Sequence, residues 1–169
     1  MKDKSTKALV VYYSRSGVTK KLGSAIADSL VCDEEEIIDL KNRDGAIGYV
    51  LSGRDATLRK LADIRHMSYD VDDYDLIIMG TPIWAFNMCP AVRTFLTNNK
   101  DKFNGSKGGS KKLAFFCTMG GSGDEKTFDE MESLSGKTPV AVIALKTKEV
   151  ISDKFSKQVE DFVSKLKKN

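Results

Sequence analysis

Residue types that commonly build metal centres and disulfide frameworks are scarce in this chain of 169 residues. It has one histidine, His66, and three widely spaced cysteines, Cys32, Cys89 and Cys117, with no C-x-x-C pair. A structural zinc site needs about four such ligands at close spacing, and a disulfide framework needs cysteines in even number. We therefore expect three reduced thiols and no metal.

Long apolar runs are missing as well. The longest, at 8–13 and 140–145, have six residues, whereas a membrane-spanning helix needs about 20. The N-terminal MKDKSTK lacks the apolar core of a signal peptide. Lys and Arg number 27 against 24 acidic residues, and they are scattered, which is typical of a solvated surface rather than of a nucleic-acid site. We expect a cytoplasmic protein that binds neither membrane nor nucleic acid.

What the chain does contain is a regular alternation of strand-like and helix-like segments. Five short apolar runs predict strands, and four of them are continuous, as strands covered on both faces should be; they lie at 8–13, 37–40, 76–79, 113–117 and 140–145. Helical periodicity lies between and after them, near 18–30, 46–65, 90–96, 127–134 and 155–166. Because parallel strands need crossover connections, this order predicts a single α/β domain over residues 1–169, a three-layer sandwich with a five-stranded parallel sheet.

Two helix starts carry capping signals, and one segment reads as a loop. Thr127 and Glu130 fit a capping box, and Ser152 or Asp153 can cap the last helix. The glycine-rich stretch 104–112 predicts a flexible loop before the fourth strand.

The loop after the first strand is rich in hydroxyl groups and leads directly into a helix. It reads Ser14, Arg15, Ser16, Gly17, Val18 and Thr19. Free backbone N–H groups at a helix N-terminus, together with three hydroxyls, suit an oxyanion such as a phosphate. An ordinary Ser/Thr helix cap is the simpler alternative, but three hydroxyls together at the end of a buried strand favour phosphate binding.

The loops after the third and fourth strands are unusual too. The first holds the only tryptophan of the chain and a polar side chain that can bond a ring edge, in the run Pro82, Ile83, Trp84, Ala85, Phe86, Asn87. The second lets backbone approach a ligand closely, in the run Thr118, Met119, Gly120, Gly121, Ser122, Gly123. Taken alone, Trp84 could simply cover the sheet end, and the glycines could form a plain flexible loop. Carboxyl ends of parallel strands share one edge, so the three loops predict one ligand site.

With these residues the chain resembles the flavodoxins and related FMN-binding proteins over nearly its whole length, in the short-chain form. The family pattern after the first strand is a hydroxyl residue, any residue, a hydroxyl residue, glycine, any residue and threonine, which Ser14, Ser16, Gly17 and Thr19 match. The resemblance implies the strand order 2-1-3-4-5 with FMN at the switch between strands one and three. It also implies that residues 14–19 hold the phosphate, that Trp84 lies beside the isoalloxazine ring, and that residues 118–123 address the ring edge.

Two departures from the family pattern matter. Many carrier flavodoxins place a tyrosine of the third loop on the outer flavin face, whereas this chain has glycines there, which leaves that face open or covered by Met119 or Phe86. Carrier flavodoxins are commonly acidic, whereas this chain has a formal net charge of +3. Fewer acidic neighbours should make a bound flavin easier to reduce.

Two functions follow from the resemblance. The first is a one-electron carrier with no catalytic side chain, acting as a monomer or weak dimer between a reductase and an acceptor protein. The alternative is an FMN-dependent NAD(P)H:quinone-type oxidoreductase, which an open flavin face and a basic surface favour. A receiver domain of the same strand order is excluded, because Tyr13 and Gly80 stand where its acidic residues belong.

Overall fold

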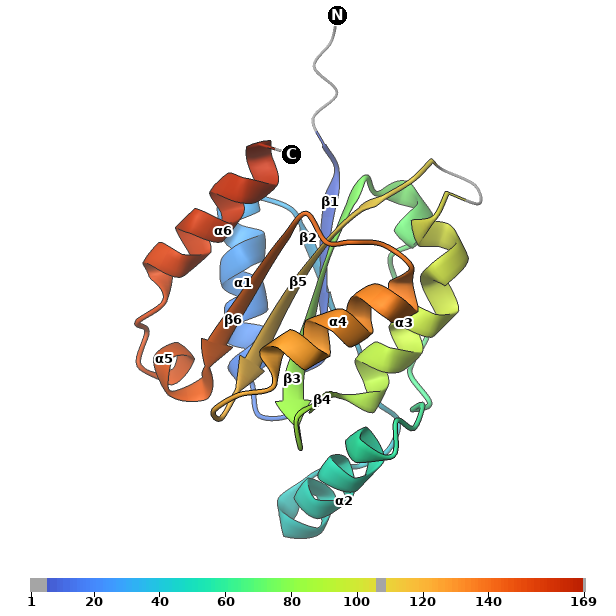
Figure 1. Ribbon diagram of the computed structural model, residues 1–169, viewed down its shortest axis with the longest axis vertical. Coiled ribbons are helices and arrows are strands. Elements are labelled where there is room, and N and C mark those ends of the chain that lie inside the picture. The colour runs from blue at the N-terminus through green and yellow to red at the C-terminus, as the bar shows by residue number, and fades with distance from the viewer. Residues whose placement is uncertain (1–5, 106–108, 169) are drawn as a thin grey trace, which may run out of the picture.

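The computed structural model describes residues 6–105 and 109–168, and its centre is a parallel sheet (Figure 1). The sheet order is β2-β1-β3-β5-β6, and each of these neighbouring pairs is parallel. The strands are β1 (Ala8–Tyr12), β2 (Asp33–Glu36), β3 (Leu76–Trp84), β5 (Lys112–Met119) and β6 (Ala141–Lys146). The short β4 (Asn87–Met88) folds back antiparallel on the end of β3. Numbered among the parallel strands alone, the order is 2-1-3-4-5, which confirms the predicted fold.

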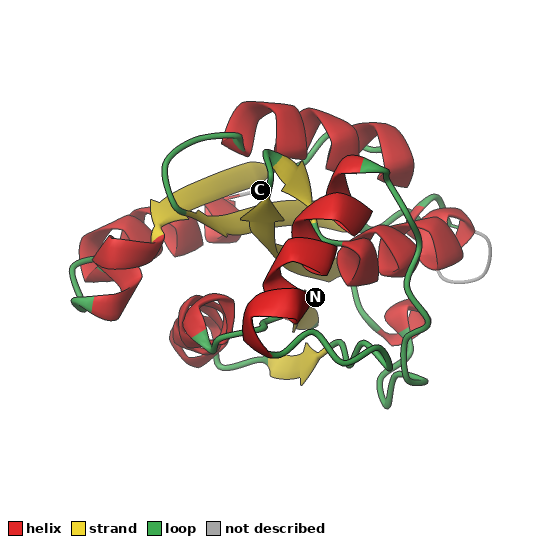
Figure 2. Cartoon of the chain, turned by 90° about the horizontal axis from the view of Figure 1, so that it is seen from below, coloured by secondary structure: helices red, strands yellow, loops and turns green. Residues whose placement is uncertain are grey.

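Helices cover both faces of the sheet (Figure 2). One apolar core joins the sheet to α1 (Val18–Leu30) and α6 (Ser156–Lys168), and a second joins it to α3 (Pro90–Phe103) and α4 (Asp124–Ser135). Helix α2 (Gly45–Thr57) belongs to neither layer and lies at the lower end of the molecule in Figure 1. Two short helices, η1 (Val71–Asp73) and α5 (Thr147–Ile151), complete the described elements.

The second strand is not the apolar run at 37–40 that the sequence pattern predicts. It is the preceding acidic segment Asp33–Glu36, which pairs along β1. Its carboxylates have partners: the Tyr74 hydroxyl donates to Asp33 at 2.7 Å, and the Lys20 ammonium donates to Glu36 at 3.0 Å. Pairing with a buried strand and these side-chain contacts outweigh the low strand propensity of acidic residues.

The helix predicted over 46–65 begins at Gly45 and ends at Thr57. The chain after it turns back toward the segment that follows β2, where the Leu40 N–H donates to the Asp63 backbone carbonyl and the Arg65 N–H donates to the Ile38 carbonyl. These backbone bonds replace the helical ones, so the apolar residues at 58–65 do not continue the helix.

Three smaller expectations were also wrong. Helix α4 begins at Asp124, so Thr127 lies in its first turn and forms no capping box. Ser152 ends α5, which was not predicted, and does not cap α6. Strand β3 continues to Trp84 instead of ending at 79, because its last residues pair with β5 and β4. Part of the predicted loop 104–112, at 106–108, lies outside the described residues.

Candidate functional site

A cavity of about 570 Å³ opens at the carboxyl ends of β1, β3 and β5. Eleven of the predicted site residues line it: Arg15, Ser16, Val18, Thr19, Pro82, Ile83, Trp84, Ala85, Thr118, Met119 and Gly120. The three predicted loops therefore meet around one space. Seven predicted residues do not line this space: Ser14, Gly17, Phe86, Asn87, Gly121, Ser122 and Gly123.

The first loop has the features of an anion site. Helix α1 starts after Gly17, whose φ of 85° only glycine adopts without strain, and no side chain caps its first turn. The Ser14 hydroxyl is buried and has no hydrogen-bond partner among the described residues. Because a buried hydroxyl without a partner is costly, Ser14 fits an acceptor that arrives with a ligand. Ser14, Ser16 and the free amides at the start of α1 thus suit a phosphate.

Thr19 has a different role from the one its position in the motif suggests. Its hydroxyl is buried and lies 2.7 Å from the hydroxyl of Thr118, at the end of β5. This bond ties the first loop to the third across the floor of the cavity. Each hydroxyl can donate one hydrogen, and the bond uses only one of the two, so the other remains for a ligand.

The second loop is a tight hairpin rather than an irregular loop. Its two central residues, Ala85 and Phe86, have φ of 47° and 62°, the geometry of a two-residue β-hairpin turn. Asn87, 4% exposed, donates from Nδ2 to the Ala85 carbonyl and accepts at Oδ1 from Lys126 at 2.8 Å. The side chain predicted to bond a ligand therefore holds the turn, and Asn87 does not face the cavity.

Trp84, the last residue of β3, both packs and lines the cavity. Its ring meets the Tyr13 ring edge-on, with 5.5 Å between centroids, and the Arg43 guanidinium lies 5.6 Å from the indole centroid. Covering the sheet end and contacting a ligand are therefore compatible roles for Trp84, because packing by Tyr13 and Arg43 fixes the orientation in which the ring meets a ligand.

The glycines of the third loop divide into two kinds. Gly120 lines the cavity, whereas Gly123 directly precedes α4 with a φ of 112°, and a Cβ there would lie 3.1 Å from the Phe86 Cα. Gly123 therefore allows the third loop to pack on the hairpin, which is a structural role. The hydroxyl of Thr147 donates to the Met119 carbonyl at 3.1 Å and fixes the end of β5.

Sequence reasoning missed one wall of the cavity. Helix α2 contributes Tyr49, Val50, Ser52, Gly53 and Arg54 to the lining. These residues lie within the helix and not in the loop that follows β2, so a search of the loops after strands does not reach them. The sequence pattern gives no signal for this wall, because Ile47, Val50 and Leu51 share one helical face, which predicts burial, whereas Ile47 and Val50 are exposed.

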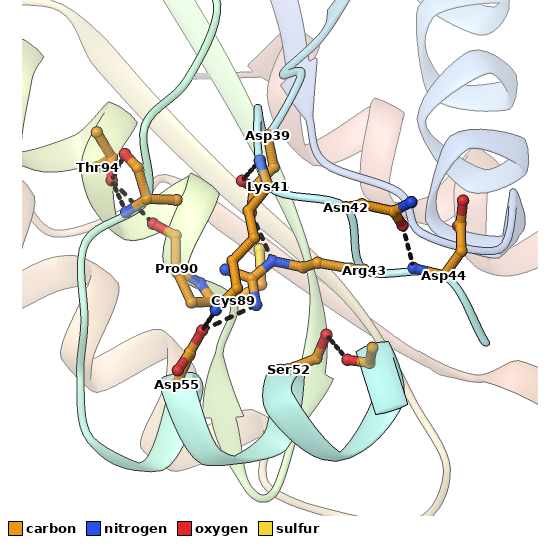
Figure 3. Close-up of polar contacts among 12 residues, drawn as sticks. Asp39, Lys41, Asn42, Arg43, Asp44, Ser52, Asp55, Cys89, Pro90 and Thr94 are labelled. Atoms are coloured by element: carbon orange, nitrogen blue, oxygen red, sulfur yellow. Dashed lines mark hydrogen bonds and ion pairs between the residues drawn. The ribbon is translucent and has the colours of Figure 1, made fainter. Parts of the chain in front are cut away.

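A group of ion pairs with a buried centre, Asp39, Arg43 and Asp55, anchors α2 (Figure 3). Asp55 accepts from Lys41 at 2.7 Å and from Arg43 at 3.2 Å, and the Arg43 Nε donates to Asp39 at 2.5 Å. Burial alone would raise the pKa of the Asp55 carboxyl, but hydrogen bonds from Lys41, Arg54 and Arg43 outweigh it and hold that pKa well below its usual range. We refer to Asp39, Lys41, Arg43, Arg54 and Asp55 as the anchor cluster.

The cysteines near the site are packed thiols. Cys89 and Cys117 are buried, and burial raises the pKa of Cys89 to about 11 and that of Cys117 still further. Both thiols are protonated at neutral pH, which disfavours a nucleophilic role. The described residues contain no group of three His, Cys, Asp or Glu that could hold a metal ion, and none of the described helices is long and apolar enough to cross a membrane.

Comparison with known proteins agrees with this architecture. Residues 7–166 match the model of a family described as flavodoxin. The chain is similar to a Lactobacillus acidophilus flavoprotein solved in complex with FMN, at 23% identity and a TM-score of 0.69, over 88% of this chain and 98% of that one. It is also similar to a flavodoxin, WrbA-like protein from Agrobacterium tumefaciens, at 15% identity and a TM-score of 0.54, over 94% of this chain and 99% of that one. A third similar structure is Megasphaera elsdenii flavodoxin in its two-electron reduced form, at 20% identity and a TM-score of 0.50, over 82% of this chain and 85% of that one.

Proposed function

The chain belongs to the flavodoxin family, which makes FMN its cofactor, and on that premise we propose that it carries single electrons between redox proteins. One observation supports the carrier best: the cavity is lined by no Asp, Glu, His, Lys or Cys among the described residues. Apart from Tyr49, the described lining therefore offers no side chain that could act as general acid or base. Such a site is suited to binding and tuning a cofactor.

In this proposal the first loop holds the phosphate. Ser14 and Ser16 donate hydroxyl hydrogens, the amides at the start of α1 donate along the helix axis, and Arg15 supplies positive charge. No carboxylate competes with the phosphate among the residues that line the cavity. The phosphate thereby fixes one end of the cofactor.

The remaining walls orient the ring system, and bound FMN supplies the redox chemistry. Trp84, held by Tyr13 and Arg43, offers an aromatic surface beside the ring. The backbone from Thr118 to Gly120 reaches the ring edge. Arg15 and Arg54 are the charged residues of the lining, so the site favours extra negative charge on the cofactor and makes it easier to reduce.

The partners of a carrier would be a reductase and an acceptor protein, met transiently in the cytoplasm by a monomer or weak dimer. The second candidate is an FMN-dependent NAD(P)H:quinone-type oxidoreductase. It is favoured by the exposed third loop, where Gly120 and Gly121 have no side chain and Ser122 has only a small one to cover the ring. A small substrate could then approach from that side.

A visible absorption spectrum recorded while NADPH is added without oxygen separates the two. A carrier loaded with FMN stays oxidised for minutes and is reduced only after a flavodoxin reductase is added. Bleaching of the flavin absorption by NADPH within seconds, with turnover on a quinone, would overturn the carrier proposal and support the oxidoreductase. A protein that is colourless and ignores added FMN would contradict both.

A further inference from the structure

Helix α2 packs on the rest of the protein with small and polar residues and exposes large apolar ones, the reverse of an ordinary surface helix. Its buried residues are small or polar and share one face at i, i+4, i+7 and i+8: Gly48, Ser52, Asp55 and Ala56. Its large apolar side chains are exposed, with Ile47 at 78%, Tyr49 at 65% and Val50 at 67%. Apolar residues grouped in this way at the mouth of a cavity indicate a surface that a ligand covers.

Within this group, Tyr49 faces the cavity. It lines the space together with Val50, whereas Ile47 does not. The guanidinium of Arg15 lies 5.1 Å from the centroid of the Tyr49 ring. Arg15 belongs to the first loop, so this cation–π contact brings the phosphate loop and α2 together and directs the ring of Tyr49 inward.

Aromatic rings are few in the lining of the cavity. Tyr49 and Trp84 are the only aromatic residues among the described residues that form it. Trp84 already has Arg43 over its ring and Tyr13 at its edge. The third loop offers only glycine and serine at the mouth, at 120–122. Tyr49 is therefore the aromatic group left to meet the second face of a flat ligand.

The anchor cluster holds α2 in the place that this contact needs. Asp55 lies on the buried face of α2, less than two turns after Tyr49, and its partners Lys41 and Arg43 belong to the segment before the helix (Figure 3). Arg43 also contacts Trp84. One buried ion-pair group thus fixes both aromatic walls of the cavity relative to each other.

Building on the proposed function, we propose that α2 covers the outer face of the flavin, with Tyr49 lying on the isoalloxazine ring and Asp55 as the positioning residue. The Tyr49 ring takes the place that the third-loop tyrosine has in many carrier flavodoxins. A covered face also hinders a nicotinamide from stacking on the flavin, which agrees with an electron carrier.

The test titrates apoprotein with FMN and with riboflavin, following visible absorption and circular dichroism, in Tyr49→Ala, Tyr49→Phe and the control Ile47→Ala. Loss of a ring–ring contact should raise the dissociation constants of both flavins by roughly three- to tenfold in Tyr49→Ala and change the dichroism of the bound flavin. Tyr49→Phe and Ile47→Ala should match the wild type. Because Tyr49 is exposed, its replacement should leave the melting temperature of the apoprotein unchanged.

Asp55 is tested by a double-mutant cycle. Asp55→Asn should weaken flavin binding in the wild-type background and have a smaller effect in Tyr49→Ala, because the part of its role that passes through Tyr49 is already lost there. If Asp55→Asn does not fold, Lys41→Gln, at the surface of the anchor cluster, replaces it with the same expectation. An equal loss in both backgrounds would overturn the positioning role.

The failure of this inference differs from that of the proposed function. A wild type that binds FMN, with Tyr49→Ala indistinguishable from Ile47→Ala, overturns the cover and leaves the carrier in place. A wild type that binds neither FMN nor riboflavin overturns both.

Discussion

At the scale of single residues, the hydroxyl of Ser14 is the feature that best distinguishes a binding loop from a helix cap. A cap would accept from the first-turn amides of α1, yet no side chain does so. The Ser14 hydroxyl is instead buried, with no hydrogen-bond partner in the part of the chain that the structure describes. Its hydroxyl lowers the stability of the empty protein, and a ligand acceptor would restore the missing bond.

Ser14→Ala is therefore expected to have effects of opposite sign. The free apoprotein should become more stable by roughly 1 kcal/mol, because an unsatisfied hydroxyl is removed. The affinity for FMN should fall about tenfold, since a hydrogen bond to a charged group is lost, while riboflavin, which lacks the phosphate, should bind as before. Urea unfolding and calorimetric titration measure the two effects.

Ser164→Ala, at an exposed position of α6, is the control and should change neither quantity. Equal losses for FMN and riboflavin in Ser14→Ala would contradict a phosphate site in this loop.

Single residues also show how far sequence alone can go. Ser16 and Trp84 could be assigned to the cavity because their positions at strand ends follow from the fold class. Asn87 could not be excluded from the ligand site on sequence grounds, because a side-chain amide can bond either to a ligand or to the backbone of a hairpin turn. The positive φ of Ala85 and Phe86, which no sequence signal marks, shows that these residues form a hairpin turn, to which the Asn87 side chain is hydrogen-bonded.

At the scale of elements, α2 depends on close backbone packing. A Cβ at Gly48 would lie 2.2 Å from the carbonyl carbon of Arg43, whereas one at Gly53 would meet only the Ala85 Cβ, at 3.9 Å. The backbone packing of α2 therefore requires glycine at position 48, whereas position 53 has room for a side chain.

We expect Gly48→Ala to destabilise the apoprotein by about 1–3 kcal/mol, because the helix must move away from the segment before it. Gly53→Ala should stabilise it by about 0.5–1 kcal/mol, since alanine favours the helix and has room. Chemical unfolding of both variants under the same conditions checks this pair. Stability changes of the same sign would show that α2 does not pack as described.

The anchor cluster makes α2 sensitive to acid. The pKa of Asp55 is lower in the folded protein than the roughly 3.9 of an unfolded chain. Its contribution is therefore complete above about pH 5 and is lost as the pH falls below 4 toward the folded pKa. Wild-type stability should drop more steeply below pH 5 than that of Asp55→Asn, measured by urea unfolding at each pH. If the free energy of unfolding of both proteins falls with pH at the same slope, Asp55 is not a source of the acid sensitivity.

The position of the second strand could not be predicted from the local sequence pattern. The apolar run at 37–40 is the stronger strand signal, yet the acidic segment before it pairs with β1. Its partners, among them Tyr74 and Lys20, are distant in sequence, so no local window contains the information. The buried strands β1 and β5 carry their own signal and were located correctly.

At the scale of the whole molecule, strand order and the edge that holds the cavity were predictable, because parallel connectivity leaves few arrangements. The anchor cluster was not, since it joins residues from one loop and one helix through side chains whose burial depends on the completed fold. The wall formed by α2 was missed for the same reason.

Because the cavity forms only when the first loop, α2, the hairpin and the third loop are in place, flavin binding should stabilise the entire domain. At an FMN concentration a hundred times the dissociation constant, the free energy of unfolding should rise by about 2.7 kcal/mol. Thermal melting with increasing FMN measures this. An unchanged midpoint at saturation would mean that FMN binds the unfolded chain as well.

The acidic character of β2 has a consequence for how copies of the protein meet one another. β2 lies at one edge of the sheet, where unpaired backbone groups can recruit strands from other molecules and start aggregation. Here Asp33, Glu34, Glu35 and Glu36 line that edge, and Glu35 accepts from the amides of Ser68 and Tyr69, which places chain beside it. The acidic edge of a second copy would meet charge of the same sign and a margin already bonded to residues 68 and 69, so we expect the residues that make β2 a poor strand in isolation to hinder edge-to-edge pairing between copies.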